Sequence, residues 1–495
     1  MGTGYTRNDG SNNIADGNVI NASDLDGEFD AVVSAFGTSG HTHDGTAAEG
    51  GPVTVLGPVQ DFVATATEIK PKTTNTLSIG TASLQFKDLY IDGTANIDNI
   101  VVDGTVNIQA TYPTGTSNVG FGSGTFAAVE AGATLNTAMG VNALQDLTTG
   151  DGNTAIGYQA ALNATTANYA IAIGTNAIGL GVLTGTDNTA IGRGAGADLT
   201  SGTYNFFGGY AAGANATTAD NTIAIGREAI GLGVLTGDYN IALGQFAGYD
   251  LTSGANNFFA GRYAGFNVTT GIYNISQGYQ AGYTATTGSY NIFQGFGAGL
   301  NATTVSNTVA IGRAAIGTGV LTGTDNTAIG QGAGNDLTSG QYNNFMGLQA
   351  AYNATTADNT VAIGRAAIGS GVLTGDDNVA IGYLAGYDLT SGSGNFFGGL
   401  RAGQTVTTGA DNVAIGQSSL GGAALTGDRN IAIGFQAGHD LTSGAYNDFS
   451  GYRAGFNLTT GSYNILQGHQ AGNNATTATS TIAIGKDVIS SGVLT

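Results

Sequence analysis

The stretch "NTAIGYQA" at Asn153–Ala160 recurs with small changes along most of the chain. It returns as "NTAIGRGAG" from Asn188, "NIALGQFAG" from Asn240, "NVAIGYLAG" from Asn378 and "NIAIGFQAG" from Asn430. Repetition at a fixed spacing is the sequence signature of an array in which each unit packs on its neighbours. The length of the period therefore decides the fold.

The glycine that ends "AIG", called the marker glycine below, sets this period. It recurs every 17 or 18 residues from Gly140 to Gly485, and Gly122 in "NVGFG" extends the series by one unit. Helical repeats need about 33 residues or more, and frequent glycine destabilises helices. One coil of a parallel β-solenoid, with two short strands and two turns rich in Gly, Asn, Asp and Thr, fits the period. We predict an all-β fold, a β-roll of about 22 coils and roughly 100 Å long at ~4.8 Å per coil.

The residue two places before each marker glycine alternates in size. Units with Ala there place Ile or Leu next, as at Ile156 and Ile191. Other units have Phe there, followed mostly by a small or polar residue; these are Phe207, Phe259, Phe293, Phe345, Phe397 and Phe449. Neighbouring strand residues face opposite sides. We therefore predict that these isoleucines and phenylalanines form the repeat core on two buried faces, an interior and a second face that meets partner chains in a homotrimer.

An asparagine stands four residues before most marker glycines. The series begins with Asn153, Asn188, Asn205, Asn240 and Asn257. Stacked asparagine side chains can form an amide ladder that hydrogen-bonds the turn backbone. A ladder that binds a ligand is the alternative, and the residues favour the structural role.

Changes in composition and residue pattern divide the chain into residues 1–40, 41–115 and 116–495. The first region has one helical stripe at steps of four, three and four residues, formed by Leu25, Phe29, Val32 and Phe36. Two heptads are too short to be stable alone. The stripe packs on a neighbouring chain or docking partner, or on the next segment of its own chain. The second region predicts short strands of a connector, and the third is the solenoid.

The composition excludes several classes of function. The chain has 495 residues, 85 glycines, no cysteine and a formal net charge of -21. So few basic residues disfavour nucleic acid as a partner, and the absence of cysteine excludes disulfides and thiolate metal sites. No apolar run approaches the roughly 18 residues of a membrane span, and the first residues lack the basic and apolar regions of a signal peptide. No nucleophile and base are arranged for catalysis, so we predict that the protein is not an enzyme.

One short motif has the residues of a metal site. "GHTHDG" contains His41 and His43, whose rings would lie on one side of a strand. A trimer would bring six imidazole nitrogens around one metal ion. A polar turn after the helix is the alternative, and it is favoured. Carboxylate pairs such as Asp376 and Asp377 could bind calcium weakly, although turn chemistry explains them better.

Three stretches resemble known proteins. "YTRNDGSNNIADGNVINASDLDGEFDAVVSAFGTSGHTHDGTAAEGG" at 5–51 resembles the N-terminal region of tail fibre proteins of short-tailed phages, especially those of marine bacteria and cyanobacteria. "LSIGTASLQFKDLYIDGTANIDNIVVDG" at 77–104 resembles a segment common in phage fibre proteins, where it leads into a trimeric shaft. The repeats resemble arrays in such fibres and the heads of trimeric autotransporter adhesins, which read like "SVAIG". The resemblance implies a homotrimer in the virion, docked through its N-terminal region on tail adaptor or nozzle proteins. His41 and His43 resemble pairs that hold iron in some long fibres.

These features predict a structural phage tail fibre that extends toward the host cell surface for adsorption. The chain ends at "SSGVLT" within a coil, so we expect contact with a host receptor directly or through a separate tip protein. A trimeric bacterial surface adhesin is the alternative, and it would need a signal peptide and a membrane barrel. An ice-binding solenoid and a depolymerase are disfavoured, because threonine clusters in varied turns and no irregular insertion interrupts the repeat.

Overall fold

The computed structural model describes residues 55–56, 62–64, 69–71, 117–130 and 132–489. The chain divides into two units, Met1–Val106 and Asn107–Thr495. In the first unit the described residues form a small antiparallel sheet of β1 (Val55–Leu56), β2 (Phe62–Ala64) and β3 (Ile69–Pro71), with β2 in the centre. The expected helix with Leu25, and His41 with His43, lie outside the described residues.

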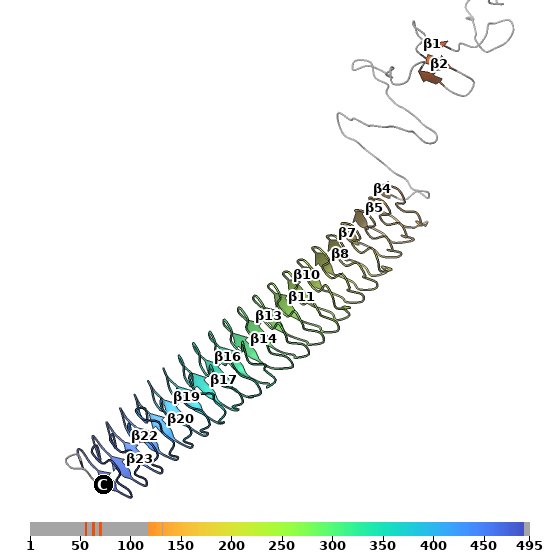
Figure 1. The fold of residues 1–495 in the computed structure, drawn as a ribbon. Helices are drawn as coiled ribbons and strands as arrows, with labels where there is room; N and C mark the ends of the chain where they lie inside the picture. Colours follow the sequence, from red (N-terminus) through yellow and green to blue (C-terminus); the bar gives the residue numbers. More distant parts are fainter. Residues whose placement is uncertain (1–54, 57–61, 65–68, 72–116, 131, 490–495) are drawn as a thin grey trace, which may run out of the picture. The chain divides into compact units, whose positions relative to one another are not determined.

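The second unit is a parallel β-solenoid, and Figure 1 shows its coils stacked into a rod. Each of its 22 strands, β4 to β25, pairs in parallel with the strand one coil before and one coil after it, and β4 and β25 are the two ends of the ladder. The strands are β4 (Val119–Phe121), β5 (Thr137–Met139), β6 (Thr154–Ile156), β7 (Ile171–Ile173), β8 (Thr189–Ile191), β9 (Phe206–Gly208), β10 (Ile223–Ile225), β11 (Ile241–Leu243), β12 (Phe258–Ala260), β13 (Ile275–Gln277), β14 (Ile292–Gln294), β15 (Val309–Ile311), β16 (Thr327–Ile329), β17 (Asn344–Met346), β18 (Val361–Ile363), β19 (Val379–Ile381), β20 (Phe396–Gly398), β21 (Val413–Ile415), β22 (Ile431–Ile433), β23 (Asp448–Ser450), β24 (Ile465–Gln467) and β25 (Ile482–Ile484).

The register of the ladder follows the repeat without a slip. Ala224 of β10 lies between Phe207 of β9 and Ala242 of β11, so the middle residues of successive strands are aligned. The predicted parallel solenoid is therefore confirmed for the described residues. The prediction of two strands per coil was wrong, because each coil has one three-residue strand. The rest of the coil is turns, joined between coils by backbone hydrogen bonds and, at Ala164–Leu183, Ala216–Leu235 and Val406–Leu425, by isolated bridges.

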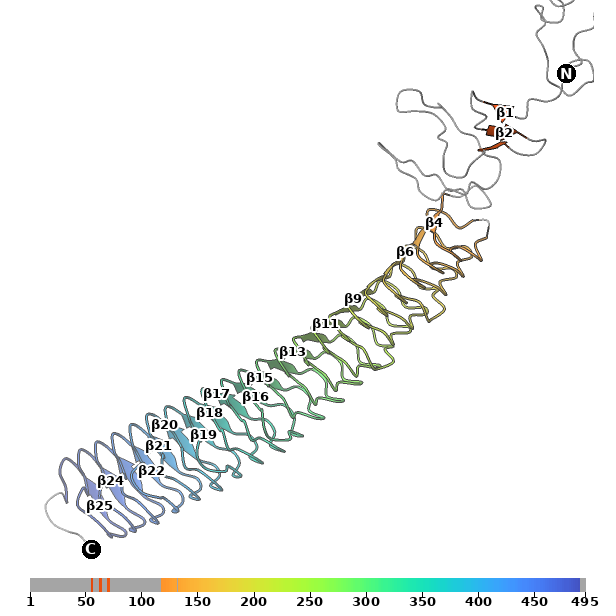
Figure 2. The ribbon, with the colours of Figure 1, turned by 45° about the horizontal axis from the view of Figure 1, so that its top comes forward.

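The marker glycines explain why each strand stops where it does. Those of the described coils have φ between +121° and +141°, a region that L side chains rarely adopt. A Cβ atom on Gly261 would also lie 2.6 Å from the carbonyl oxygen of Gly278 in the next coil. The backbones of successive coils therefore approach closely at this corner, and only glycine fits. Figure 2, turned from the first view, shows the bends of successive coils in line along the rod.

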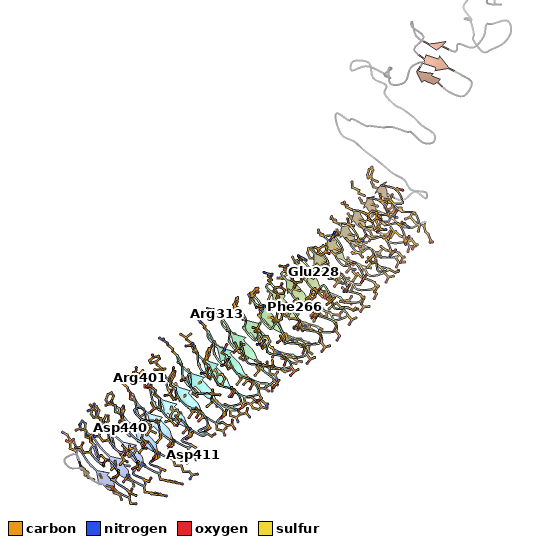
Figure 3. All side chains as sticks on the ribbon, in the orientation of Figure 1. Glu228, Phe266, Arg313, Arg401, Asp411 and Asp440 are labelled. Atoms are coloured by element: carbon orange, nitrogen blue, oxygen red, sulfur yellow. The ribbon has the colours of Figure 1, made fainter. Side chains whose placement is uncertain are left out.

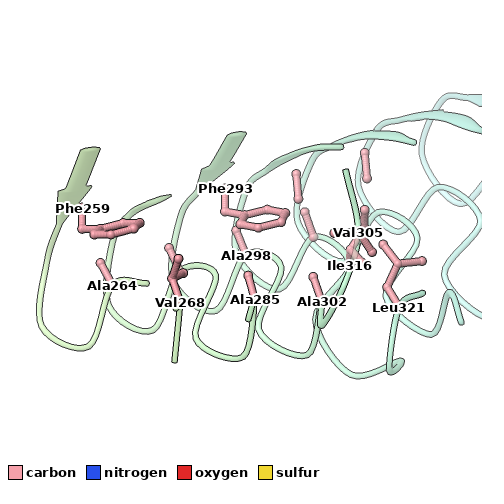
Figure 4. Packing of buried hydrophobic residues seen from close by; sticks show 14 of the residues in the cluster. Phe259, Ala264, Val268, Ala285, Phe293, Ala298, Ala302, Val305, Ile316 and Leu321 are labelled. Carbon is pink, nitrogen blue, oxygen red and sulfur yellow. The ribbon is translucent and has the colours of Figure 1, made fainter. Parts of the chain in front are cut away.

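The interior of the rod is filled by the middle residue of each strand and by small residues of the turns. Phe207 is fully buried between Gly196 and Gly213, where an added Cβ would come within 2.8 and 2.5 Å of its ring. Most coils in which both neighbouring strands have Ala carry a buried Ile or Leu at the glycine position, such as Ile178, and the exception is Ala161. Figure 4 shows Phe259 and Phe293 directed from their strands into this interior. Large side chains thus come from the strand in some coils and from the turn in others, and both kinds fill the interior.

The structure places the two predicted sets on opposite faces of the strands. The six phenylalanines lie in the interior, at 0–1% exposure. Ile156 and Ile191 point outward from the third position of their strands and are 37% and 42% exposed in the single chain, so their burial against a partner chain stays a prediction. The reason is the alternation of side chains along a strand, which places Ala155 and Ala190 inside.

Candidate functional site

The predicted asparagines lie inside the rod, at the turn before each strand. Asn257 donates from Nδ2 to Oδ1 of Asn240 at 3.1 Å and to the carbonyl of Gly271 at 2.8 Å. Its own Oδ1 accepts from the backbone N–H and from Nδ2 of Asn274, at 2.9 and 3.2 Å. In the same way, Asn205 donates from Nδ2 to Oδ1 of Asn188, and Asn153 donates to Oδ1 of Asn136. All these side chains are buried, so the ladder hydrogen-bonds the backbone of neighbouring coils and exposes no surface to a ligand.

A second ladder lies at the same turn but on its outer side, where aspartates gather. Ten acidic residues stand five or six residues before a marker glycine and define the aspartate edge: Asp151, Asp187, Asp220, Asp238, Asp325, Asp358, Asp376, Asp377, Asp411 and Asp428. The Asp220 carboxylate accepts the N–H of Thr203 at 2.6 Å, and Asp238 accepts the N–H of Asp220 at 2.8 Å. These carboxylates bind the backbone of the preceding coil. Within the described residues, no three His, Cys, Asp or Glu side chains are grouped as a metal site.

Basic residues gather at the opposite turn, directly after the strands. Of the nine Lys and Arg side chains in 117–489, eight lie one or two residues after a marker glycine: Arg193, Arg227, Arg262, Arg313, Arg365, Arg401, Arg453 and Lys486. We call this turn the arginine edge. Figure 3 shows Arg313 and Arg401 along one long side of the rod and Asp411 along the other. The remaining one, Arg429, lies on the aspartate edge, 3.4 Å from Asp411.

Aromatic rings accompany the arginines on this edge. The guanidinium of Arg193 lies 4.6 Å from the ring centre of Tyr210, and that of Arg262 lies 4.8 Å from the ring centre of Tyr263. Such contacts stabilise a partly exposed cation by about 0.5–1 kcal/mol. Acidic groups are also present: burial raises the pKa of the Asp250 carboxyl, and burial together with Glu228 and Asp250 raises the pKa of the Tyr249 hydroxyl. The edge thus offers flat apolar faces, hydroxyls and both signs of charge.

The outward side of the strand ladder is mainly apolar. We define the outer strand face as the first and third residues of β4 to β25, two per strand and 44 in all. Only Asp448 among them is charged, and most are Ile, Val, Leu, Met or Phe. Ile225 and Ile415 are 43% and 39% exposed. Large, mainly apolar surfaces are uncommon on monomeric soluble proteins and are typical of interaction sites.

The arginine edge was missed by the sequence analysis, although a signal for it exists. Counting basic residues by their offset from the marker glycine would have placed eight of nine at one turn. The predicted sites at His41, His43 and the helical stripe lie outside the described residues. In the part of the chain that the structure describes, no helix is long and apolar enough to cross a membrane.

Comparisons with protein families, with curated proteins and with solved structures find no match to this chain. The β-solenoid is therefore assigned from the structure itself.

Proposed function

We propose that this protein is the structural shaft of a phage tail fibre, in which three copies associate through the outer strand face. The single observation that carries the proposal is the uninterrupted ladder from β4 to β25 with one charged residue among 44 outward positions. Burying partly exposed isoleucines stabilises an association by about 25 cal/mol per Å² of apolar surface. The number of copies and the virion location come from the resemblance of the N-terminal stretches to tail fibres.

The interior of the solenoid supports a mechanical role. Successive coils are joined by backbone hydrogen bonds, by the asparagine ladder and by interlocked Phe and Gly positions. Each coil buries the face of the one before, so the rod gains length by adding coils without needing a new sequence for each. In this proposal the protein acts by reach and attachment and does not catalyse a reaction. Its partners are copies of itself, tail adaptor or nozzle proteins, and a host receptor or a separate tip protein.

Self-association is tested by charge placed on the outer strand face. Ile225→Lys with Ile415→Lys should convert a trimer of native protein into folded monomers, because both side chains point outward and no carboxylate is available on the neighbouring strand positions. Leu180→Lys with Leu232→Lys is the matched control, since these leucines are each 57% exposed but lie in turns. The control should keep the native mass. Equal masses for both variants and the native protein would contradict the assigned surface.

The virion location needs its own experiment. Antibodies raised against the solenoid should label particle tails by immunogold electron microscopy of a lysate from the source culture. Labelling of bacterial envelopes with unlabelled particles would overturn the proposal and favour the surface adhesin.

A further inference from the structure

Five aromatic rings from three successive coils form stacks on the arginine edge. Tyr249, Phe266 and Tyr283 stack in one column, with ring centres 4.9 and 5.1 Å apart and planes within 11° and 6°. Phe246 stacks on Tyr263 at 5.2 Å and 9° in a parallel column. The two columns touch edge to face, with the ring centres of Tyr263 and Phe266 5.5 Å apart. The rings are half-buried, so part of each remains open to solvent.

The columns line a surface hollow of about 610 Å³. Its polar groups are the carboxylate of Glu228, the guanidinium of Arg262, the amide of Gln280 and tyrosine hydroxyls that include that of Tyr279. Among the described residues, Arg262 has no carboxylate within ion-pair distance, and its Nη2 lies 3.3 Å from the hydroxyl of Tyr263. The hollow therefore combines donors and acceptors with an aromatic floor.

A second hollow, of about 470 Å³, lies on the same edge and has a single aromatic ring in its lining. Its lining includes Arg193, Tyr210 and Asp198. It also includes Asn176, whose Oδ1 is buried and has no hydrogen-bond partner in the protein. A buried acceptor without a partner costs about 1–3 kcal/mol.

We propose that the arginine edge binds a polysaccharide, with the hollows at Arg193 and Arg262 as separate subsites. A sugar ring has an apolar C–H face that can lie on an aromatic ring and a rim of hydroxyls that both donate and accept. The hollows match both properties, because each is lined by an arginine, a carboxylate and at least one tyrosine. A simple anion site would not place Glu228 and Asp198 next to its cations. A second copy of the chain is expected to bind on the outer strand face instead of in these hollows.

The spacing of the subsites favours a polymer over a single sugar. Arg193 follows β8 and Arg262 follows β12, so four coils or roughly 19 Å separate them. A chain that spans both subsites gains affinity by effective concentration, even when each contact is weak. Arg365 with Tyr383 and Arg453 with Tyr452 continue the pairing along the edge, each at 5.5 Å. Polysaccharide binding would supply the attachment to the host surface, and in that respect it rests on the proposed function.

The test is titration of the full chain with a fixed panel of oligosaccharides, namely glucans, galactans and mannans and their uronate counterparts. Tyr263→Ala with Phe266→Ala should lower the affinity for the best panel member at least about tenfold, because the variant removes one ring from each column. The matched control is Tyr273→Ala with Tyr290→Ala, a stacked pair at 5.2 Å on the aspartate edge. The control should bind within about twofold of the native protein.

Three results would overturn the proposal. They are no binding of any panel member by the native chain, equal binding by both double variants, or a changed native mass of the Tyr263 and Phe266 variant. The last result would assign the edge to contact between copies. Binding of a neutral sugar should also be nearly the same at about 50 mM and about 500 mM NaCl, whereas steep salt dependence would indicate charge pairing instead. The native mass reports fibre assembly separately, so failure of one proposal is distinguishable from failure of the other.

Discussion

The marker glycine gives the sharpest test of the coil geometry, through the substitution Gly261→Ala. Gly261 has φ of +136°, and an added Cβ would lie 2.6 Å from the carbonyl oxygen of Gly278. Strain in this backbone region costs about 1–3 kcal/mol. Relief of the contact would also lengthen hydrogen bonds such as Gly278 N–H to Ala260 O, now 2.8 Å, each contributing about 1 kcal/mol. We expect a total loss of about 4 kcal/mol at this coil.

The matched control is Gly297→Ala, two residues after a marker glycine. Gly297 has φ of +60°, and no atom lies within 4 Å of an added Cβ. Gln280 occupies the same place one coil earlier with φ of +56°, so a side chain is tolerated there. A left-handed conformation costs an L residue about 1–2 kcal/mol. The control should therefore lose far less stability than Gly261→Ala.

Amide hydrogen exchange is the suitable assay, because long repeat arrays depart from two-state unfolding and a single melting curve would average over coils. Exchange of the amides in β12 and β13 should be faster by a factor of several hundred in Gly261→Ala, as about 4 kcal/mol implies. Coils near β20 should exchange as in the native protein. Equal exchange in the two glycine variants would refute the argument that close approach requires glycine at this corner.

Three further predictions concern two interior side chains and one carboxylate of the arginine edge. Phe259→Ala should reduce the free energy of unfolding of its coils by about 3–5 kcal/mol, since the adjoining glycines cannot fill the cavity, and hydrogen exchange would show it. Asn257→Ala should cost about 2–4 kcal/mol by the same assay, because the N–H of Asn274 and the carbonyl of Gly271 lose buried partners. Asp250→Asn should stabilise the fold slightly at neutral pH, because burial raises the pKa of this carboxyl and so disfavours its charged form. That difference should vanish below about pH 3, where Asp250 is protonated in both the folded and the unfolded chain, and hydrogen exchange of the adjoining coils would show it.

The period of the sequence was enough to predict the parallel solenoid. Seventeen residues exclude helical repeats, and the marker glycine, the asparagine and the alternating residues all recur in one register, which a one-residue slip would break. The ladder between Asn257 and Asn240 follows from that register alone. Local rules and the global fold agree in these coils, which is why the pattern was informative.

The faces of the strand were harder to assign, because alternation separates two sides without saying which is inside. Ile156 and Ala155 were expected on opposite faces, but the sequence did not say which of the two side chains faces the interior. The structure places Ala155 inside, where Leu144 and Ala161 of the turns are also buried. Only the turn four residues after each marker glycine resolves this, and its partner lies in the neighbouring coil, as with Gly196 and Phe207.

The candidate subsites were not predicted, because their members are separated in sequence. Tyr249, Phe266 and Tyr283 are 17 residues apart and become neighbours only when the coils stack. Their offset from the marker glycine is constant, so a repeat-aligned sequence would show the column. The depth of the hollow and the unpartnered oxygen of Asn176 require coordinates.

The most direct test of the fibre account is the native mass of the full chain, measured by light scattering together with sedimentation. The account predicts three times the chain mass of 49.2 kDa and a strongly elongated particle, with the outer strand faces of three copies buried. A particle of 49.2 kDa that stays monomeric at high protein concentration would contradict it, because the apolar face would then be stable in water without a partner.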